Sequence, residues 1–242
     1  MTYPIHRLSA LAEITPRETE ILVTLGDHEI SRSKGEVFQI EGDAVHGFHL
    51  NIVGWVTSSI MLPNGKRLIQ KVHLPGDMLS TPNMVSSKAI DTLIAMTDGV
   101  TAFVPFSRFG RIYADAPRLA ALLTIAAQLE RLALMDGLAM TGNASGKERI
   151  IRLLVDLHAR LTLAGMIKDE TFELPLSQEM IGDLVGMTNV HVNRMLRNLE
   201  DAGFISRAGR QFTFLDLTAL KRLCPLLPRR PAIDLAWLPP AA

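Results

Sequence analysis

The sequence predicts an α+β protein built from an antiparallel β-roll, a long helix, and a helix-turn-helix unit with a β-hairpin wing. Three observations predict this fold class. Glycine turns, recurring about every ten residues, divide residues 27–110 into short strand-like segments. Apolar residues at three- and four-residue spacing then mark a helix from residue 116 to 140. Finally, two short amphipathic helices meet at Gly186, and two strand-like segments follow them.

The composition is that of an ordinary globular protein with room for two modest domains. The chain has 242 residues, of which 48% are hydrophobic and 21% charged, and its formal net charge is zero. A neutral chain does not suit a protein that coats nucleic acid as a whole. Residues 1–143 hold 12 basic and 14 acidic side chains, whereas residues 144–230 hold 13 basic and 10 acidic. Only the second half therefore has the sign of charge that contact with phosphate requires.

Several classes of protein are disfavoured by what the sequence lacks. The single cysteine, Cys224, permits no intramolecular disulfide and no multi-cysteine metal or iron–sulfur site. No signal-peptide core is found, and the longest apolar stretch, 119–127, is too short to span a bilayer, so we expect a cytoplasmic protein without a membrane partner. A nucleophile elbow, a phosphate loop, a metal-spaced helix and a paired-acid motif are all missing from the sequence. We therefore expect no enzymatic activity and no cofactor.

The first predicted domain, residues 1–115, begins with a helix and continues as the roll. Thr15 and Pro16 are suited to start a helix that runs to about residue 26. Asn64-Gly65, between strand-like segments 54–61 and 67–73, predicts a hairpin because its turn requires a positive φ. The roll interior is expected to contain a cavity. Candidates for its lining are Met61, Met78, Met84 and Met96, with ordinary core filling as the alternative role.

The second predicted part, residues 116–143, is a long helix with a hinge after it. A seam of about three heptads consists of Leu119, Leu122, Ala126, Leu129, Ala133, Asp136 and Met140. Such a seam is typical of a two-stranded dimer interface, and packing against the protein's own roll is the alternative. Because further apolar residues lie on other faces of the helix, we expect both kinds of burial. Small and polar residues at 141–146 predict the hinge.

The third predicted part, residues 144–224, contains the helix-turn-helix unit and the wing. A helix at 147–163 and a short strand at 172–174 precede the unit. Ser177 and Thr188 are placed to cap its two helices, the second of which spans about 188–202, since a hydroxyl accepts from first-turn N–H groups. Strand-like segments between 203 and 215 form the wing, and 217–223 form a closing helix. The proline-rich tail, 225–242, is expected to be extended.

The second helix of the unit has a polar face that suits DNA. Its apolar stripe is Val192, Met195, Leu196 and Leu199, and its opposite face carries Asn189, His191, Asn193, Arg194, Arg197 and Asn198. That polar face has no acid before Glu200. Amides and guanidiniums match base edges and phosphates in the major groove, so the pattern predicts a recognition helix. A solvated helix face is the alternative interpretation of each of these polar residues.

Taken in order, these features resemble the CRP/FNR superfamily of bacterial transcription regulators. The resemblance covers about residues 10–224 and rests on the turns KGE, EGD, VGW, NGK and PGD, the long helix, and IGDLVGMTNVHVNRMLRNLEDAGFIS at 181–206. It implies a cyclic-nucleotide-binding-like roll and a homodimer formed through the long helix. It also implies a regulator of transcription that binds palindromic double-stranded DNA and contacts RNA polymerase.

The resemblance also implies which residues contact DNA. The full set is Ser177, Gln178, Thr188, Asn189, Val190, His191, Asn193, Arg194 and Arg197. Within it, Arg194 suits guanine O6 and N7, and Asn193 suits adenine. Val190 stands where the family commonly has a glutamate, and a valine can contact only a thymine methyl. Ser177, Gln178 and His191 are expected beside phosphates, where they would fix register rather than sequence.

The signal that would control such a regulator is not named by the sequence. Cyclic-nucleotide-binding members use a glutamate and an Arg-Ser pair, but here the pair's position falls near Asp91-Thr92, and an acid repels a cyclic phosphate unless Lys88 compensates. Iron–sulfur members need N-terminal cysteines, which are missing. Haem bound through His46, His49 or His73 remains an alternative. So do an unidentified small-molecule effector, an effector-independent dimer, and a signal module that no longer binds DNA.

Overall fold

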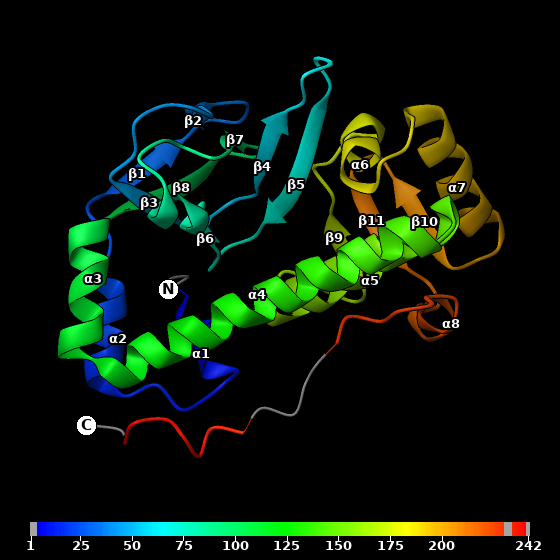
Figure 1. The fold of residues 1–242 in the computed structure, drawn as a ribbon. Helices are drawn as coiled ribbons and strands as arrows, with labels where there is room; N and C mark the ends of the chain where they lie inside the picture. Colours follow the sequence, from blue (N-terminus) through cyan, green and yellow to red (C-terminus); the bar gives the residue numbers. More distant parts are fainter. Residues whose placement is uncertain (1–3, 230–233, 241–242) are drawn as a thin grey trace. The chain divides into compact units, whose positions relative to one another are not determined.

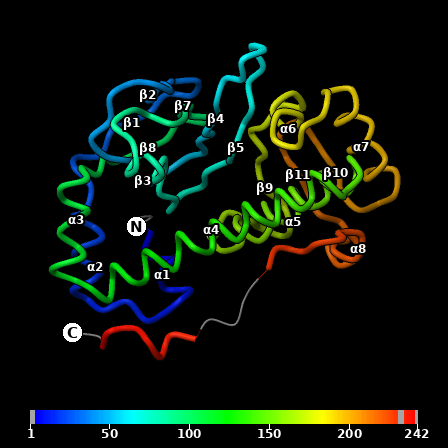
Figure 2. Tube along the Cα trace, viewed as in Figure 1, coloured from blue at the N-terminus to red at the C-terminus, as the bar shows by residue number. Residues whose placement is uncertain are grey.

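The computed structural model describes residues 4–229 and 234–240 (Figures 1 and 2). The chain divides into two compact units. The first comprises residues 1–129 together with 231–242, and the second comprises residues 130–230. Each unit is described by itself below. Among the described residues, no helix combines the length and apolarity needed to cross a membrane.

The first unit opens with two short helices, α1 (Ile5–Ser9) and α2 (Pro16–Val23). The predicted start of α2 is confirmed by a capping box. Thr15 Oγ1 accepts from the backbone N–H of Glu18 at 3.2 Å, and the Glu18 carboxylate accepts from the N–H of Thr15 at 2.9 Å. The helix ends at Val23, three residues before the predicted end. Arg118 donates to Glu18 at 2.7 Å, which ties α2 to the long helix.

The roll consists of two four-stranded antiparallel sheets. One has the order β1-β8-β3-β6, and the other has the order β2-β7-β4-β5. The strands of the first sheet are β1 (Glu29–Arg32), β8 (Gly99–Pro105), β3 (Gly47–Val53) and β6 (Met78–Leu79), and those of the second are β2 (Val37–Gln39), β7 (Thr92–Ala95), β4 (Val56–Met61) and β5 (Arg67–His73). The predicted hairpin is confirmed as β4 and β5, and Gly65 in its loop has a φ of +77°. A 3-10 helix, η1 (Thr81–Val85), lies between β6 and β7 in the chain.

One face of the first sheet packs against helices and forms the core of this unit. Phe48 and Val104 on that face pack with Leu22 of α2 and with Ile112 of α3 (Phe106–Asp115). Phe48 and Phe109 meet edge to face with their ring centroids 5.1 Å apart. The sequence did not predict α3, which lies beside α2 and lines a common cleft with it (Figure 1).

The prediction that four methionines line a cavity in the roll is wrong. Met61 ends β4 next to the hairpin loop and is 60% exposed, and Met84 is also exposed. Met78 packs against the helical core on the other face of the sheet. Met96 accepts a hydrogen bond from the Thr57 hydroxyl at 3.6 Å. The residues differ in environment because strand alternation and strand ends, not residue type, decide which side chains point inward.

Helix α4 (Pro117–Asn143) is longer than the sequence predicted, and Figure 2 traces it without a break. The predicted hinge at 141–146 is wrong for residues 141–143 and for Gly146, which are helical. Thr141 Oγ1 and Asn143 Nδ2 donate to the carbonyls of Gly137 and Ala139, both at 3.1 Å, so their polar groups are satisfied within the helix. Only Ala144 and Ser145 separate α4 from the next helix.

The heptad seam expected on α4 is largely covered by the protein's own side chains. Leu119 and Leu122 belong to the core of the first unit, and Asp136 and Met140 are buried. The exposed apolar positions in the C-terminal part of α4 are instead Leu134 (62%), Met135 and Leu138 (74%). The periodicity therefore predicted the helix correctly, but the stripe left open for a partner lies on a different face.

The second unit contains the helix-turn-helix and its wing. Its elements, besides the end of α4, are α5 (Gly146–Leu163), β9 (Thr171–Glu173), α6 (Gln178–Val185), α7 (Asn189–Asp201), β10 (Ile205–Ala208), β11 (Gln211–Phe214) and α8 (Leu217–Arg222). The three strands form one antiparallel sheet in the order β10-β11-β9. Phe172, Phe212 and Phe214 cluster on it with ring centroids 5.3 to 5.9 Å apart. The predicted wing and closing helix are confirmed.

A buried carboxylate anchors the described start of the C-terminal tail to this unit. Asp136 of α4 is 2% exposed and pairs with Arg152 of α5 and with Arg229, whose Nε donates at 2.7 Å. Burial opposes ionisation, but the hydrogen bonds and charges of Arg229 and Arg152 outweigh it and hold the pKa of Asp136 below its usual value. Arg152 also donates to the carbonyl of Leu226. Cys224 is buried nearby, and burial raises the pKa of its thiol.

Candidate nucleic-acid interface

The turn between α6 and α7 is fixed by two caps and one glycine. Ser177 Oγ accepts from the N–H of Met180 at 3.2 Å and caps α6, and Thr188 Oγ1 accepts from the N–H of His191 at 3.4 Å and caps α7. Gly186 ends α6 in the left-handed region, with φ +67° and ψ 45°. These three local features confirm the two caps and the turn that the sequence predicted.

A second glycine sets the distance between the two helices. A Cβ on Gly182 would lie 2.4 Å from the carbonyl oxygen of Met187, and no real side chain tolerates such a contact. The N–H of Met187 donates to the Gly182 carbonyl at 2.9 Å, so the turn is bonded to α6 at this point. The close approach allows Ile181 of α6 and Val192 of α7 to be buried together in this unit.

The predicted contact residues lie on one outward side of this motif. Helix α7 buries Val192, Leu196 and Leu199. The nine predicted positions divide into the exposed Ser177, Thr188, Asn189, Val190, His191, Arg194 and Arg197 and the half-buried Gln178 and Asn193. Val190, at 73%, is a large apolar side chain left in water at the start of the helix. A single exposed apolar residue is common on protein surfaces, and this one lies at the end of the helix that is predicted to contact DNA.

The charge on this side is positive. Within residues 4–229 and 234–240, neither Arg194 nor Arg197 forms an ion pair or a hydrogen bond through its guanidinium. The first acid on α7, Glu200, accepts from Arg207 of the wing at 2.5 Å, and this bond holds the pKa of Glu200 below its usual value. The nearest carboxylate on the helix is therefore bonded mainly to Arg207, and the charge of Arg197 contributes less to its lowered pKa.

His191 is oriented by the cap residue. Thr188 Oγ1 lies 3.0 Å from the ring Nδ1 of His191 while the same oxygen accepts from the His191 backbone. When the hydroxyl proton is donated to Nδ1, the neutral ring carries its hydrogen on Nε2. An exposed N–H donor at that nitrogen matches a phosphate oxygen or a base acceptor.

The wing arginines are engaged with acids, unlike those of α7. Arg207 bonds to Glu200, and Arg210 pairs with Glu173 at 3.4 Å. The structure brings each of them to an acid that lies elsewhere in the chain, and only the Arg210 pair is mostly exposed and open to exchange with a phosphate.

The geometry agrees with what known proteins show. Residues 148–223 match the family model described as a Crp-like helix-turn-helix domain. The solved structure of FixK2 from Bradyrhizobium japonicum is 25% identical, covers 82% of this chain and 98% of its own, and superposes with a TM-score of 0.72. Residues 148–223 therefore form a Crp-like helix-turn-helix domain, and the chain resembles CRP/FNR-type transcription regulators over about four-fifths of its length. It is also similar to the nitrogen fixation regulation protein FixK of Bradyrhizobium diazoefficiens, with 29% identity over 79% of both chains. A further relative is the transcriptional regulatory protein btr of Bordetella pertussis, with 26% identity over 75% of this chain and 73% of the relative.

In the roll of the regulator, the position expected to face a cyclic phosphate is filled by a buried polar network. The Asp91 carboxylate accepts from Ser80 Oγ at 2.5 Å and from Gln39 Nε2 at 2.8 Å, and Asn83 Nδ2 donates to Gln39 Oε1 at 3.1 Å. Burial raises the pKa of Asp91 against the effect of these hydrogen bonds. Lys88 is exposed on the loop and does not enter the network. The site thus offers a cyclic phosphate a carboxylate instead of a cation.

The three histidines considered for haem do not come together. His46 is exposed, whereas His73 is buried and lies 2.9 Å from Ser58 Oγ and 3.8 Å from the Asp77 carboxylate. His49 is buried between Phe38 and Phe103, with both ring centroids 5.3 Å away. Over the described ranges, no group of three His, Cys, Asp or Glu side chains is placed to hold a metal ion. These residues do not fit a shared haem or metal site.

His49 should make the stability of the roll depend on pH. Burial, with a smaller contribution from the Arg32 charge, lowers the pKa of His49 from 6.5 to about 4. The unfolded chain therefore binds a proton at a higher pH than the folded chain, so the free energy of unfolding falls as pH drops from 6.5 towards 4. The loss reaches about 3 kcal/mol at most.

Urea denaturation at several pH values checks this expectation. His49→Phe keeps an aromatic ring between Phe38 and Phe103 and should remove much of the loss. The same substitution at exposed His46 is the matched control and should leave the pH profile unchanged. Equal pH profiles for His49→Phe and the wild type would contradict the assignment.

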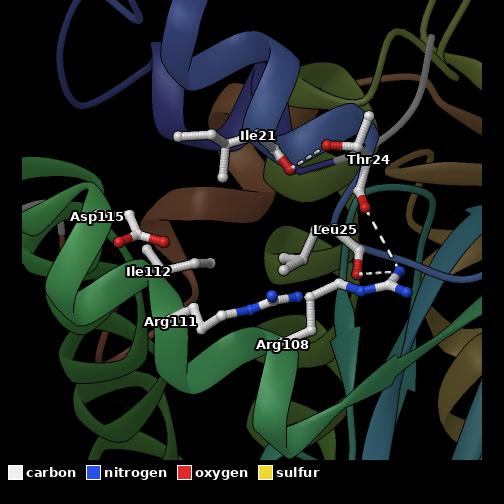
Figure 3. Close-up of a pocket in the computed structure, with 7 residues that line it drawn as sticks. All are labelled: Ile21, Thr24, Leu25, Arg108, Arg111, Ile112 and Asp115. Atoms are coloured by element: carbon white, nitrogen blue, oxygen red, sulfur yellow. Dashed lines mark hydrogen bonds between the residues drawn. The ribbon is translucent and has the colours of Figure 1, made fainter.

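A cleft of about 280 Å³ lies between α2 and α3 (Figure 3). Its residues are Ile21, Thr24, Leu25, Arg108, Arg111, Ile112 and Asp115. Arg108 donates to the carbonyls of Leu25 and Gly26 at 3.2 and 2.8 Å and pairs with Asp27 at 2.7 Å. This arginine closes the C-terminal end of α2 and is not free to bind a ligand.

Proposed function

We propose that this regulator is a homodimeric, sequence-specific DNA-binding protein of the cytoplasm that places α7 in the major groove of a palindromic site. The observation that carries the proposal is the outward side of α7, where Arg194 and Arg197 have no acid partner within the described chain while Val192, Leu196 and Leu199 bury the opposite side. A helix with this division of residues can enter a groove without losing its packing.

The contacts divide into base readers and phosphate binders. We assign base contacts to Asn189, Val190, Asn193 and Arg194, because they lie on the exposed side of the first two turns of α7. Arg194 suits guanine, Asn193 adenine, and Val190 a thymine methyl. We assign phosphate contacts to Ser177, Gln178, Thr188, His191 and Arg197.

The dimer forms through the exposed apolar stripe of α4, namely Leu134, Met135 and Leu138. Two copies related by a two-fold axis present two recognition helices to half-sites about one helical turn apart, roughly 34 Å. Contact with RNA polymerase is part of the proposal at the level of the family and is not assigned to a residue.

DNA binding does not need a cyclic nucleotide in this proposal. The acid-containing network of Asp91, Ser80 and Gln39 supports this part, because its hydrogen-bonding groups are satisfied by one another. Control by another small molecule, or by a partner protein, is compatible with the same DNA-binding surface.

Selection of bound sites from random duplex DNA by the purified regulator tests the proposal. The experiment uses no added ligand and moderate, fixed salt. We expect one two-fold-symmetric motif. Failure to enrich any motif with an intact dimer would contradict ligand-free binding, and failure that persists across a screen of effectors would contradict DNA recognition itself.

Arg194→Ala should weaken binding to the selected site by about ten- to a hundredfold per half-site and relax the preference for guanine there, because a bidentate guanine contact contributes about 1–3 kcal/mol. The arginine is exposed, so the fold and the dimer should persist. Binding isotherms on the selected site and on single-base variants measure both effects. Arg160→Ala, which removes an arginine paired with Asp156 on α5, is the matched control. Unchanged base preference would rule out the role assigned to Arg194.

A further inference from the structure

We propose that Arg149, on the first turn of α5, binds a DNA phosphate beside the turn of the helix-turn-helix. The DNA contacts assigned above all come from α6, α7 and their caps, whereas this one comes from a helix earlier in the chain. The inference rests on the proposed DNA-binding function and extends its surface.

The start of α5 packs directly against the α6–α7 turn. Arg149 Nη1 lies 3.5 Å from the position that a Cβ on Gly186 would occupy, and a Cβ on Gly146 would lie 2.6 Å from Cε of Met187. Gly186 and Met187 immediately precede the cap residue Thr188. The guanidinium of Arg149 is thus placed next to the end of α7 that is proposed to enter the groove.

Arg149 is the arginine of α5 whose charge is not matched by an acid. Arg152 pairs with Asp136, and Arg160 pairs with Asp156. Within the described residues, Arg149 forms no ion pair and its buried Nε has no hydrogen-bond partner. The adjacent acid, Glu148, is held in a capping box with Ser145, which lowers the pKa of its carboxyl. A guanidinium left unpaired in this way is able to bind an external anion.

The geometry favours a phosphate over a base as this anion. The proposed base readers lie on α7 from Asn189 onward, whereas Arg149 lies on α5 beside the turn before that helix. The neighbouring residue His191 also presents a donor suited to a phosphate oxygen, because Thr188 Oγ1 lies 3.0 Å from its Nδ1 and leaves Nε2 exposed. A planar guanidinium matches two oxygens of one phosphate, and such a contact fixes the register of the helix without reading sequence.

The test is the salt dependence of DNA affinity. Each phosphate neutralised contributes about 0.9 to the slope of log affinity against log salt, so Arg149→Ala should make the slope shallower by about 2 for the dimer. Affinity should fall equally for the selected site and for unrelated duplex, which leaves base preference unchanged. Arg149→Lys should keep most of the slope because it keeps the charge. Arg160→Ala serves as the control and should match the wild type.

A second measurement separates this role from a structural one. Uncharged methylphosphonates are placed one at a time along the selected site. A methylphosphonate at one position should weaken DNA binding by the wild type but should not weaken binding by Arg149→Ala any further. That position identifies the phosphate that Arg149 contacts. The proposal would be overturned if Arg149→Ala kept the wild-type slope of log affinity against log salt. It would also be overturned if the substitution and the methylphosphonate reduced affinity additively at every position, and Arg149 would then only support the turn. Since wild-type binding to the selected site is the starting point, failure of the proposed function would be seen first and separately.

Discussion

Gly182→Val is expected to unfold the helix-turn-helix and abolish DNA binding. The first side-chain atom would lie 2.4 Å from the Met187 carbonyl oxygen, so α6 and the turn would have to separate. Separation breaks the bond from the Met187 N–H and exposes the apolar contacts between α6 and α7. We expect a loss of more than about 3 kcal/mol, a large part of the stability of a small domain. Differential scanning calorimetry and binding to the selected site measure the two effects.

The same substitution at Gly110 is the matched control. Gly110 is also helical, in α3, but apart from its chain neighbours and the backbone of its own helix nothing lies within 4 Å of the position a Cβ would take. Gly110→Val should therefore leave the thermal transitions and DNA binding close to those of the wild type, because valine is a slightly better helix former than glycine. A Gly182→Val protein that unfolds like the Gly110→Val protein would show that the close approach of the turn to α6 is dispensable.

Features that depend on residues close together in sequence could be predicted from the sequence. Ser177 and Thr188 accept from N–H groups three residues later, and Gly186 supplies the left-handed turn between them. Each of these interactions needs only a few neighbouring residues, so the residue types by themselves indicate the geometry. The polar side of α7 follows directly once its start and its period are known.

The covered face of a helix could not be predicted in this way. A spacing of three and four residues marks every face of a helix equally well, and only tertiary packing decides which face is buried. Leu122 is thus in a core although it lies on the seam expected at the dimer interface, and Leu138 is exposed although it lies off that seam. Helix α3 was missed because Pro105 caps it without a side-chain hydrogen bond and its sequence continues from a strand.

Ion pairs and hydrogen bonds between residues distant in sequence could not be predicted from the sequence either. Asp136 meets Arg229 across 93 residues, and Asp91 meets Gln39 across 52. In both cases the sequence shows a charged or polar residue without its partner, and an acid that is bonded in the fold looks the same as one that is free. For this reason Asp136 was placed in an apolar seam, although in the fold it pairs with Arg152 and Arg229.

Leu138→Glu is expected to break the dimer and with it the binding of the palindrome. Leu138 is 74% exposed on α4, whereas Asp136 on the same helix is buried, so the substitution should leave the fold of the single chain unchanged. A two-fold interface contains each position twice. Loss of two buried leucines, together with two carboxylates facing an apolar surface, should weaken the dimer by at least about 4 kcal/mol, or about a thousandfold.

Sedimentation equilibrium over a range of protein concentrations measures this change, and DNA binding at each concentration shows whether affinity follows the dimer. Val53→Glu, at an apolar residue of the roll that is 50% exposed, is the matched control and should remain dimeric. If Leu138→Glu stays dimeric at the protein concentrations at which the wild type is dimeric, the exposed stripe of α4 is not the interface. If it becomes monomeric yet keeps full affinity for the palindrome, dimerisation is not what positions the two recognition helices. Loss of both together is expected because a single α7 can contact only one half-site, and the binding free energy of the second half-site is then unavailable to the complex.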